Sequence, residues 1–217
     1  MARDPEPRHR SVDWGKRWRN DRSLTDRVIW AIIALNVAVF VGWHMGDRDF
    51  MAAHFLTSQA HVEEGYVWTL LTYAFSHYGT GHLLFNMFGL YVFGKPIGEA
   101  RGYTEVLTVF LVGAVVAAFA HLLFGLAIPE QAKSMLGASG GVMALAAYYG
   151  GMFPDRTLLV GFVLPMPAAF AVAAFLLLDV SGLLFVQQST IAHAAHLGGA
   201  AYGLFHYQWF VQGGLGR

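Results

Sequence analysis

Long apolar stretches, separated by short polar ones, dominate the chain. A helix needs about 20 mostly apolar residues to cross a bilayer, because the hydrocarbon core is about 30 Å thick. Six stretches approach that length, and we expect a membrane-spanning helix in each of them: 28–45, 82–97, 104–126, 139–153, 158–178 and 191–211. The pattern therefore predicts an all-α membrane protein with six transmembrane helices.

The segment between the first two apolar stretches, residues 46–81, has a different pattern. It mixes polar residues with aromatic ones such as Phe50, Trp68 and Tyr73, and it carries too many polar groups to span a bilayer. Aromatic side chains are enriched at the membrane–water interface. We expect an interfacial loop structure here, lying along the membrane surface between the first and second helices.

The fifth apolar stretch, 158–178, contains Pro165 and Pro167. Proline inside a helix removes a backbone hydrogen bond and kinks the helix, so we expect a bend at these positions. Asp179 follows the stretch directly. We expect it at the outer end of this helix, as an interfacial cap and not as a member of a catalytic group.

Composition agrees with the membrane class. Of the 217 residues 56% are hydrophobic and 13% charged, whereas an ordinary soluble domain has about 25% charged residues. The absence of cysteine excludes disulfides, thiol catalysis and cysteine-ligated metal. We expect one membrane domain, 28–212, preceded by a basic tail, 1–27.

The basic residues are distributed unevenly. Twelve of the fourteen would lie on the side of the termini in a six-helix topology, which leaves Arg48 and Lys133 on the other side. The positive-inside rule then places both termini in the cytoplasm. Five acidic residues interrupt the tail, so it resembles neither an organellar transit peptide nor a nucleic-acid-binding arm. We expect a bacterial inner membrane protein.

Polar residues inside membrane spans are costly and need a reason. Four of those in the expected spans stand out: His82, Asn86, Ser139 and His196. They lie near the starts of the second, fourth and sixth helices, which all run from outside to inside. From Ser139 to the end of its stretch the helix rises about 22 Å, so Ser139 should lie roughly 8 Å below the outer surface. His196 comes out at a similar depth.

These residue types suit nucleophilic catalysis. A serine hydroxyl becomes a good nucleophile when an imidazole takes its proton. His82 and Asn86 are four residues apart, share a helix face, and are hydrogen-bond donors that suit an oxyanion hole. Glycines around the serine permit a tight turn, and those after His196 permit close helix packing; they are Gly137, Gly140, Gly141, Gly199 and Gly203.

Three segments resemble the signature segments of rhomboid proteases: HLLFN at 82–86, GASG at 137–140 and AHLGG at 195–199. The resemblance covers about residues 65–212. The longer segment HAAHLGG at 193–199, preceded by LPM at 164–166, is particularly similar to the mitochondrial, presenilin-associated type.

The resemblance implies an intramembrane serine endopeptidase that cleaves transmembrane segments of membrane proteins and needs no cofactor. It implies Ser139 as nucleophile and His196 as general base. It also implies an oxyanion hole formed by His82, Asn86 and the Ser139 backbone N–H.

One position departs from the family pattern. Many members carry an aromatic residue four positions after the serine, where this chain has Met143. We expect Met143 one turn after Ser139, beneath the dyad. We expect His193 as a supporting residue at the rim of the site, and His121 in a hydrogen bond between helices.

Other functions remain to be weighed. A zinc protease would carry His-Glu-x-x-His, which is absent, and no carboxylate stands beside His82, His193 or His196 in the sequence, so we expect no metal. A transporter is disfavoured because the polar residues do not form a path across the bilayer. The alternative is a catalytically inactive rhomboid-like protein that binds transmembrane clients.

Overall fold

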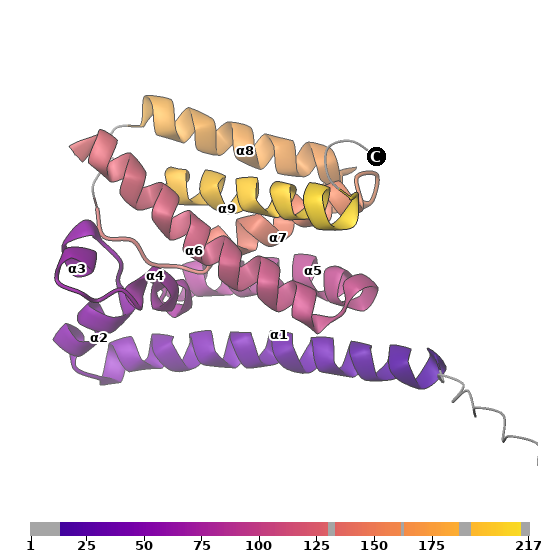
Figure 1. The fold of residues 1–217 in the computed structure, drawn as a ribbon, viewed down its shortest axis with the longest axis horizontal. Helices are drawn as coiled ribbons and strands as arrows, with labels where there is room; N and C mark the ends of the chain where they lie inside the picture. The colour runs from indigo at the N-terminus through magenta and orange to yellow at the C-terminus, as the bar shows by residue number, and fades with distance from the viewer. Residues whose placement is uncertain (1–13, 130–132, 162, 187–191, 214–217) are drawn as a thin grey trace, which may run out of the picture.

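The computed structural model describes residues 14–129, 133–161, 163–186 and 192–213. Within these ranges, six helices of 14 residues or more run roughly along the long axis of the molecule (Figure 1): α1 (Trp14–Met45), α5 (Thr80–Arg101), α6 (Tyr103–Ala127), α7 (Ser139–Met152), α8 (Ala168–Phe185) and α9 (His193–His206). Helix α7 contacts α5, α6, α8 and α9, and each of its residues is buried or half-buried. The mostly helical fold expected from the sequence is therefore confirmed, with α7 at its centre.

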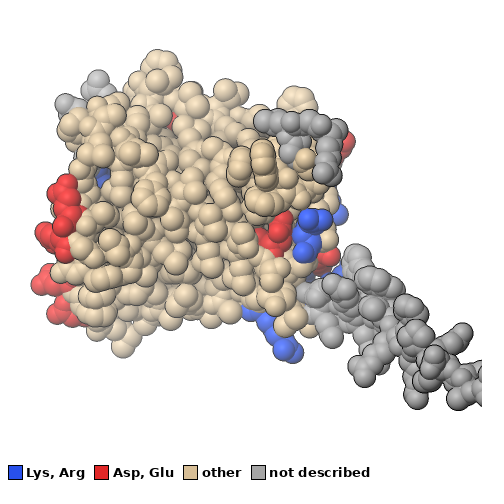
Figure 2. Space-filling model, in the orientation of Figure 1, with Lys and Arg blue, Asp and Glu red and all other residues tan. Residues whose placement is uncertain are grey.

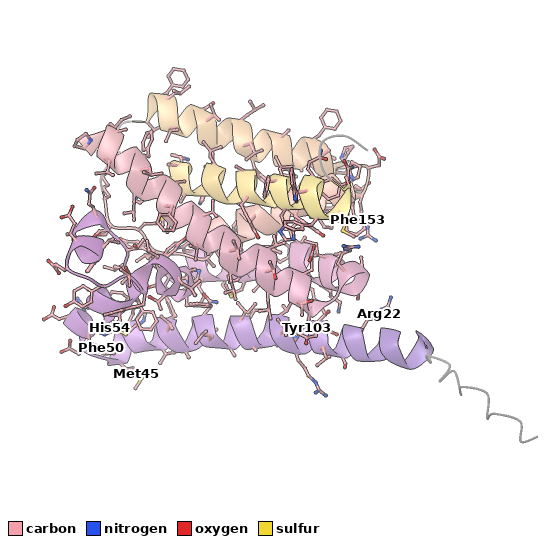
Figure 3. The ribbon with its side chains drawn as sticks, in the orientation of Figure 1. Arg22, Met45, Phe50, His54, Tyr103 and Phe153 are labelled. Carbon is pink, nitrogen blue, oxygen red and sulfur yellow. The ribbon has the colours of Figure 1, made fainter. Side chains whose placement is uncertain are left out.

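The surface has the features of a membrane protein. Charged side chains gather at the two ends of the molecule and leave a broad uncharged band between them (Figure 2). By length and apolarity, Arg22–Met45, Tyr103–Ala127 and Ala168–Phe185 can each cross a bilayer. Figure 3 places Phe50 and His54 beyond the Met45 end of the first of these segments, with Arg22 toward its opposite end.

Most helices match the expected apolar stretches closely, but α1 begins 14 residues earlier than the predicted start at residue 28. Residues 14–27 are polar and include Lys16, Arg17 and Arg19, and they contain no proline. Lysine and arginine favour the helical state, so the helix continues beyond the apolar stretch. The described part of the predicted tail is therefore helical.

The prediction for the fifth helix was wrong. Residues 158–178 do not form one bent helix, because an antiparallel hairpin of β1 (Thr157–Val160) and β2 (Leu164–Pro167) precedes α8. The hairpin turn contains Gly161 at φ +60°. Pro167 stands just before the first helical residue, where its fixed φ and missing N–H are tolerated. The helix thus begins ten residues later and ends seven residues later than predicted.

Short helices gather at one end of the bundle (Figure 1). They are α2 (Arg48–Phe55), α3 (Gln59–Glu63), α4 (Thr69–Thr72) and the 3-10 helix η1 (Tyr73–Phe75). Asp47 caps α2 by accepting from the Phe50 N–H at 2.8 Å, and Ser58 caps α3 by accepting from the His61 N–H at 3.2 Å. The segment predicted to be interfacial is therefore an ordered set of short helices, of which α2 and α3 are capped by side chains. We refer to this side of the bundle as the α2–α4 end.

Small residues allow the central helices to approach closely. A Cβ added at Gly199 of α9 would overlap the carbonyl oxygen of Gly140 in α7, and one at Gly203 would overlap that of Ala144. Backbones come this near only where both surfaces lack side-chain bulk. The two helices that carry Ser139 and His196 therefore meet backbone to backbone.

A buried polar network ties the same helices together at the opposite end. The Tyr148 hydroxyl of α7 donates to Glu105 Oε1 of α6 at 2.6 Å, and His206 Nε2 of α9 lies 3.3 Å from the same oxygen. Tyr202 and His206 are linked at 3.1 Å. The bundle is thus fixed by glycine contacts near one end and by polar contacts at the other.

Candidate active site

Ser139 and His196 are in hydrogen-bond contact. Ser139 is the first residue of α7, and His196 is in the first turn of α9. The Ser139 Oγ lies 2.8 Å from His196 Nε2, and both residues are half-buried. This distance suits transfer of the hydroxyl proton to the imidazole. The structure therefore brings together the two residues that the sequence selected as nucleophile and base.

A carboxylate that the sequence analysis assigned elsewhere completes this arrangement. Asp179 Oδ1 lies 3.0 Å from His196 Nδ1. Asp179 is only 7% exposed and sits well inside α8, so its assignment as an interfacial cap at the helix end was wrong. The cause is that α8 ends at Phe185, seven residues beyond the predicted end at residue 178, so Asp179 lies in its interior.

His193 binds the same carboxylate oxygen. Its Nδ1 lies 2.7 Å from Asp179 Oδ1, and its ring stands at 85° to that of His196 with centroids 6.4 Å apart. His193 was expected at the rim of the site, but it is in direct contact with the aspartate. The sequence signal for this group was the spacing of the two histidines, one turn apart at the start of one helix.

The three side chains also have the composition of a metal site. One nitrogen of each of His193 and His196 and one oxygen of Asp179 lie within 4.8 Å of one another. The sequence argument against metal rested on the lack of a neighbouring carboxylate, and α8 supplies one in space. However, zinc bonds of about 2.0–2.1 Å would hold tetrahedral ligand atoms about 3.3 Å apart. The separations of 2.7 Å and 3.0 Å are those of hydrogen bonds.

His82 and Asn86 lie on α5 close to the serine. The Tyr78 N–H donates to His82 Nδ1 at 3.4 Å, so the ring hydrogen is on Nε2. A Cβ added at Gly137 would lie 2.9 Å from His82 Nε2 and 3.8 Å from Ser139 Oγ. The ring of His82 therefore packs on Gly137, two residues before Ser139.

Asn86 is buried, and its amide donates to the His82 carbonyl oxygen at 2.9 Å. An amide nitrogen has two hydrogens, so a second one remains for another acceptor. Gly137 itself has φ +125°, a conformation that L side chains rarely adopt. The tight turn expected from the glycines around Ser139 is thus present.

The loop that leads to Ser139 is fastened to the α2–α4 end. Met135 and Thr57 exchange backbone hydrogen bonds of 2.8 Å and 3.0 Å, and the Gly137 N–H donates to the Tyr73 carbonyl at 3.0 Å. The Tyr73 hydroxyl in turn donates to the Ala114 carbonyl of α6 at 2.7 Å, and burial raises the pKa of this phenol. The loop is therefore hydrogen-bonded to Thr57 and to Tyr73, and Tyr73 is in turn hydrogen-bonded to α6.

His77 was not singled out by the sequence analysis. It is 3% exposed, and its Nε2 accepts from the Ala138 N–H at 3.5 Å. Burial, together with the neighbouring His82, lowers its pKa from 6.5 to about 3. A neutral imidazole can therefore accept a hydrogen bond from the residue preceding Ser139.

Two further expectations have different outcomes. Met143 packs against a cluster that includes Val172 of α8 and Ala200 of α9, while its contact with the dyad stays a prediction. Among the described residues, the hydrogen-bond partner of His121 is not in another helix: its Nε2 lies 2.8 Å from the Lys133 carbonyl in the segment before α7.

Comparisons with known proteins bear on the family of the chain. The rhomboid domain model matches residues 64–212. A mitochondrial RHOMBOID-like protein 12 of Arabidopsis thaliana is 33% identical over 86% of this chain and 59% of its own length. The mitochondrial presenilin-associated rhomboid-like proteins of Bos taurus and Homo sapiens are each 30% identical, over 88% and 90% of this chain and 50% of theirs.

The chain thus spans about half to three-fifths of the length of these relatives. The matches confirm the family that the sequence motifs indicated, including the likeness to the presenilin-associated type. The relatives named here are mitochondrial proteins, so they give no support to the bacterial inner membrane expected from the tail.

Proposed function

The chain belongs to the rhomboid family, and on that basis we propose that it is an intramembrane serine endopeptidase that cleaves transmembrane segments of other membrane proteins. The observation that carries the proposal is the 2.8 Å contact of Ser139 Oγ with His196 Nε2 inside an apolar helical bundle. Polar side chains inside an apolar bundle cost free energy to bury. A serine and a histidine held in contact there therefore favour a catalytic role.

The first half of the reaction forms an acyl-enzyme. His196 Nε2 takes the proton of the Ser139 hydroxyl as the oxygen attacks the carbonyl carbon of the scissile bond. The tetrahedral intermediate collapses when the imidazolium gives that proton to the leaving nitrogen. The new amino end departs, and the other half of the substrate is left as an ester on Ser139.

The negative charge on the carbonyl oxygen of the tetrahedral intermediate must be stabilised by hydrogen-bond donors close to that oxygen. The Ser139 N–H is at the start of α7, where backbone N–H groups have no partner within the helix. The ring of His82 packs on Gly137 of the loop before Ser139, and Asn86 is on the same face of α5 as His82. These three donors form the oxyanion hole of the proposal.

The second half of the reaction needs water. A water molecule gives a proton to His196 Nε2, attacks the ester carbonyl, and releases the new carboxylate as Ser139 regains its hydrogen. Helix α7 has 14 residues, so it rises only about 21 Å, less than the roughly 30 Å of a hydrocarbon core. The short helix supports a serine that is below the membrane surface and still within reach of water.

The proposal includes a topology. All six long helices cross the membrane, and both termini are on the cytoplasmic side. The basic residues Arg22, Arg27, Lys95, Arg101 and Arg156 then share the inner side, as the positive-inside rule requires. Ser139 and His196 face the outer half. We expect substrates whose transmembrane helix is locally unwound near the outer surface.

A labelling experiment tests the activity. The purified protein in detergent is treated with a fluorescent fluorophosphonate, and cleavage of a model transmembrane substrate is followed in parallel. We expect labelling and cleavage in the wild type and neither in Ser139→Ala, while His196→Ala cleaves nothing. Ser134→Ala, at an exposed serine in the same loop, is the matched control and should behave as wild type.

Chelator should leave cleavage unchanged. Inhibition by EDTA that zinc reverses would replace the serine mechanism with a metal-dependent one. A wild type that neither labels nor cleaves, yet retains bound transmembrane peptides, would favour the inactive, client-binding alternative.

A further inference from the structure

We infer that Asp179 positions the general base His196, and that His193 fixes Asp179 by donating to the same carboxylate oxygen. The inference rests on the proposed function for its catalytic meaning, and it adds two residues that act through His196. It starts from one relationship, the two hydrogen bonds of 3.0 Å and 2.7 Å that converge on Asp179 Oδ1.

The direction of these hydrogen bonds follows from chemistry. An ionised carboxylate has only acceptors, and each of its oxygens can take two hydrogen bonds. Both imidazoles must therefore donate from Nδ1. His196 then has its lone pair on Nε2, the nitrogen 2.8 Å from Ser139 Oγ. The carboxylate selects the one neutral tautomer of His196 that can accept the serine proton.

The position of Asp179 in α8 supports a dedicated role. Its neighbours Leu177 and Leu178 are each 67% exposed on the outside of the bundle, whereas Asp179 is turned inward and is 7% exposed. A buried carboxylate in an apolar helix is expensive unless it is paired. Two donors from α9 satisfy it, and one of them is the proposed base.

Helix α8 also provides the space that His193 occupies. Gly182 lies three residues after Asp179, on the same face of the helix. A Cβ added at Gly182 would overlap the imidazole of His193. The sequence Asp179-x-x-Gly182 therefore supplies a carboxylate together with a gap that the second histidine fills.

The two histidines have different tasks. The Asp179–His196 bond keeps the imidazole in its reactive orientation and stabilises the imidazolium after it takes the serine proton. The His193–Asp179 bond keeps Oδ1 aimed at His196. Protons move between Ser139 Oγ, His196 Nε2, the leaving nitrogen and the hydrolytic water, and Asp179 stays ionised throughout.

The test is nitrogen NMR of the full chain in detergent, with 15N-labelled histidine, combined with kinetics on a transmembrane substrate. Signals of His196 are identified by their loss in His196→Gln. In the wild type we expect hydrogen on Nδ1 of His196. In Asp179→Ala we expect it on Nε2, with kcat lower by about 10²-fold or more and KM nearly unchanged.

Matched variants separate positioning from packing. Asp179→Asn keeps the shape and one acceptor oxygen, so it should keep the Nδ1–H tautomer but lose most of kcat, because the negative charge is gone. His193→Gln keeps a donor and should retain most activity, whereas His193→Ala should lose about tenfold. Leu178→Ala changes the exposed neighbour in α8 and should match the wild type.

The NMR result does not depend on proteolysis, so it distinguishes failure of this inference from failure of the proposed function. Hydrogen on Nε2 of wild-type His196, or an Asp179→Asn variant with full kcat, would overturn the positioning role. Zinc that binds stoichiometrically to the wild type and not to His193→Ala would instead identify the three side chains as a metal site.

Discussion

Gly199 of α9 lies against the backbone of Gly140 in α7, close enough that a Cβ at position 199 would overlap the Gly140 carbonyl oxygen. Gly140 follows Ser139 directly, and Gly199 is three residues after His196. The contact therefore lies immediately beside the serine–histidine pair. It sets how far apart the two helix starts can be.

The Gly199→Ala substitution should separate α7 from α9. Overpacking of this kind costs about 1–3 kcal/mol, and a shift of about 1 Å in the reacting atoms can cost 10²-fold in rate. We expect a lower thermal midpoint and a kcat reduced by about 10²-fold. Gly81→Ala is the control, because a Cβ there meets nothing within 4 Å. Wild-type turnover of Gly199→Ala would show that the contact does not set the catalytic distance.

The proposed oxyanion donors can be removed one at a time. Loss of one such donor typically costs about 10²–10³ in kcat, or roughly 2.7–4 kcal/mol. We expect His82→Ala within this range and Asn86→Ala at its low end, since His82 Nε2–H and the Ser139 N–H remain. Phe85→Ala, at an exposed position on the same helix, serves as the control. Wild-type kcat in both variants would make these two residues structural.

His77 predicts a pH dependence of stability. Its pKa is about 3 in the folded protein and about 6.5 in an unfolded chain. Between these values the unfolded chain binds more protons, so stability is greatest above pH 6.5 and falls as the pH drops toward 3. We expect the thermal midpoint of wild type to fall more than that of His77→Gln between pH 7.5 and pH 4.5. An equal fall of the thermal midpoint in the two proteins would contradict the low pKa of His77.

The topology can be tested without background labelling, since the chain has no cysteine. A cysteine introduced at Gln59, in the α2–α4 end, should react with an impermeant maleimide added outside intact cells. One introduced at Arg101, at the other end of α5, should react only after lysis. The reverse pattern would place the candidate active site on the cytoplasmic side.

Met143 tests the one departure from the family pattern. It is one turn after Ser139 and packs against the cluster that contains Ala200, which is one turn after His196. Methionine fills irregular gaps, so Met143→Ala should leave a void that lets His196 move. We expect kcat to fall much more than KM changes, while Met143→Phe keeps substantial activity. Met143→Leu is the volume-matched control. Unchanged turnover of Met143→Ala would show that Met143 does not support His196.

The sequence predicted most of the bundle for a simple physical reason. Long apolar stretches mark helices in a membrane, and the ends of α5, α6 and α7 fall within a few residues of the predicted limits. The motifs also indicated which helix starts would meet. These features could be predicted because the residue types and their spacing are visible in the sequence, such as a serine beside glycines or two hydrogen-bond donors at helical spacing.

The region of α8 shows where such reasoning fails. An apolar run does not distinguish a strand from a helix by periodicity, so the hairpin before Ala168 was taken as part of a helix. The Pro-x-Pro pair at Pro165 and Pro167, with Gly161 upstream, was the available signal for a break. The predicted helix therefore ended at residue 178 and not at Phe185, which placed Asp179 at a helix end and hid its contact with His196.

The bridge between Met135 and Thr57, and the Gly137–Tyr73 hydrogen bond, have a consequence for hydrogen exchange. The segment before Ser139 is irregular, and irregular segments usually exchange their amide hydrogens quickly. Here the amides of Met135 and Gly137 should exchange as slowly as those of Thr57 and its neighbours, because one opening event must release them all. The nucleophile would then be carried by a cooperative unit that reaches from the α2–α4 end into the core of the bundle.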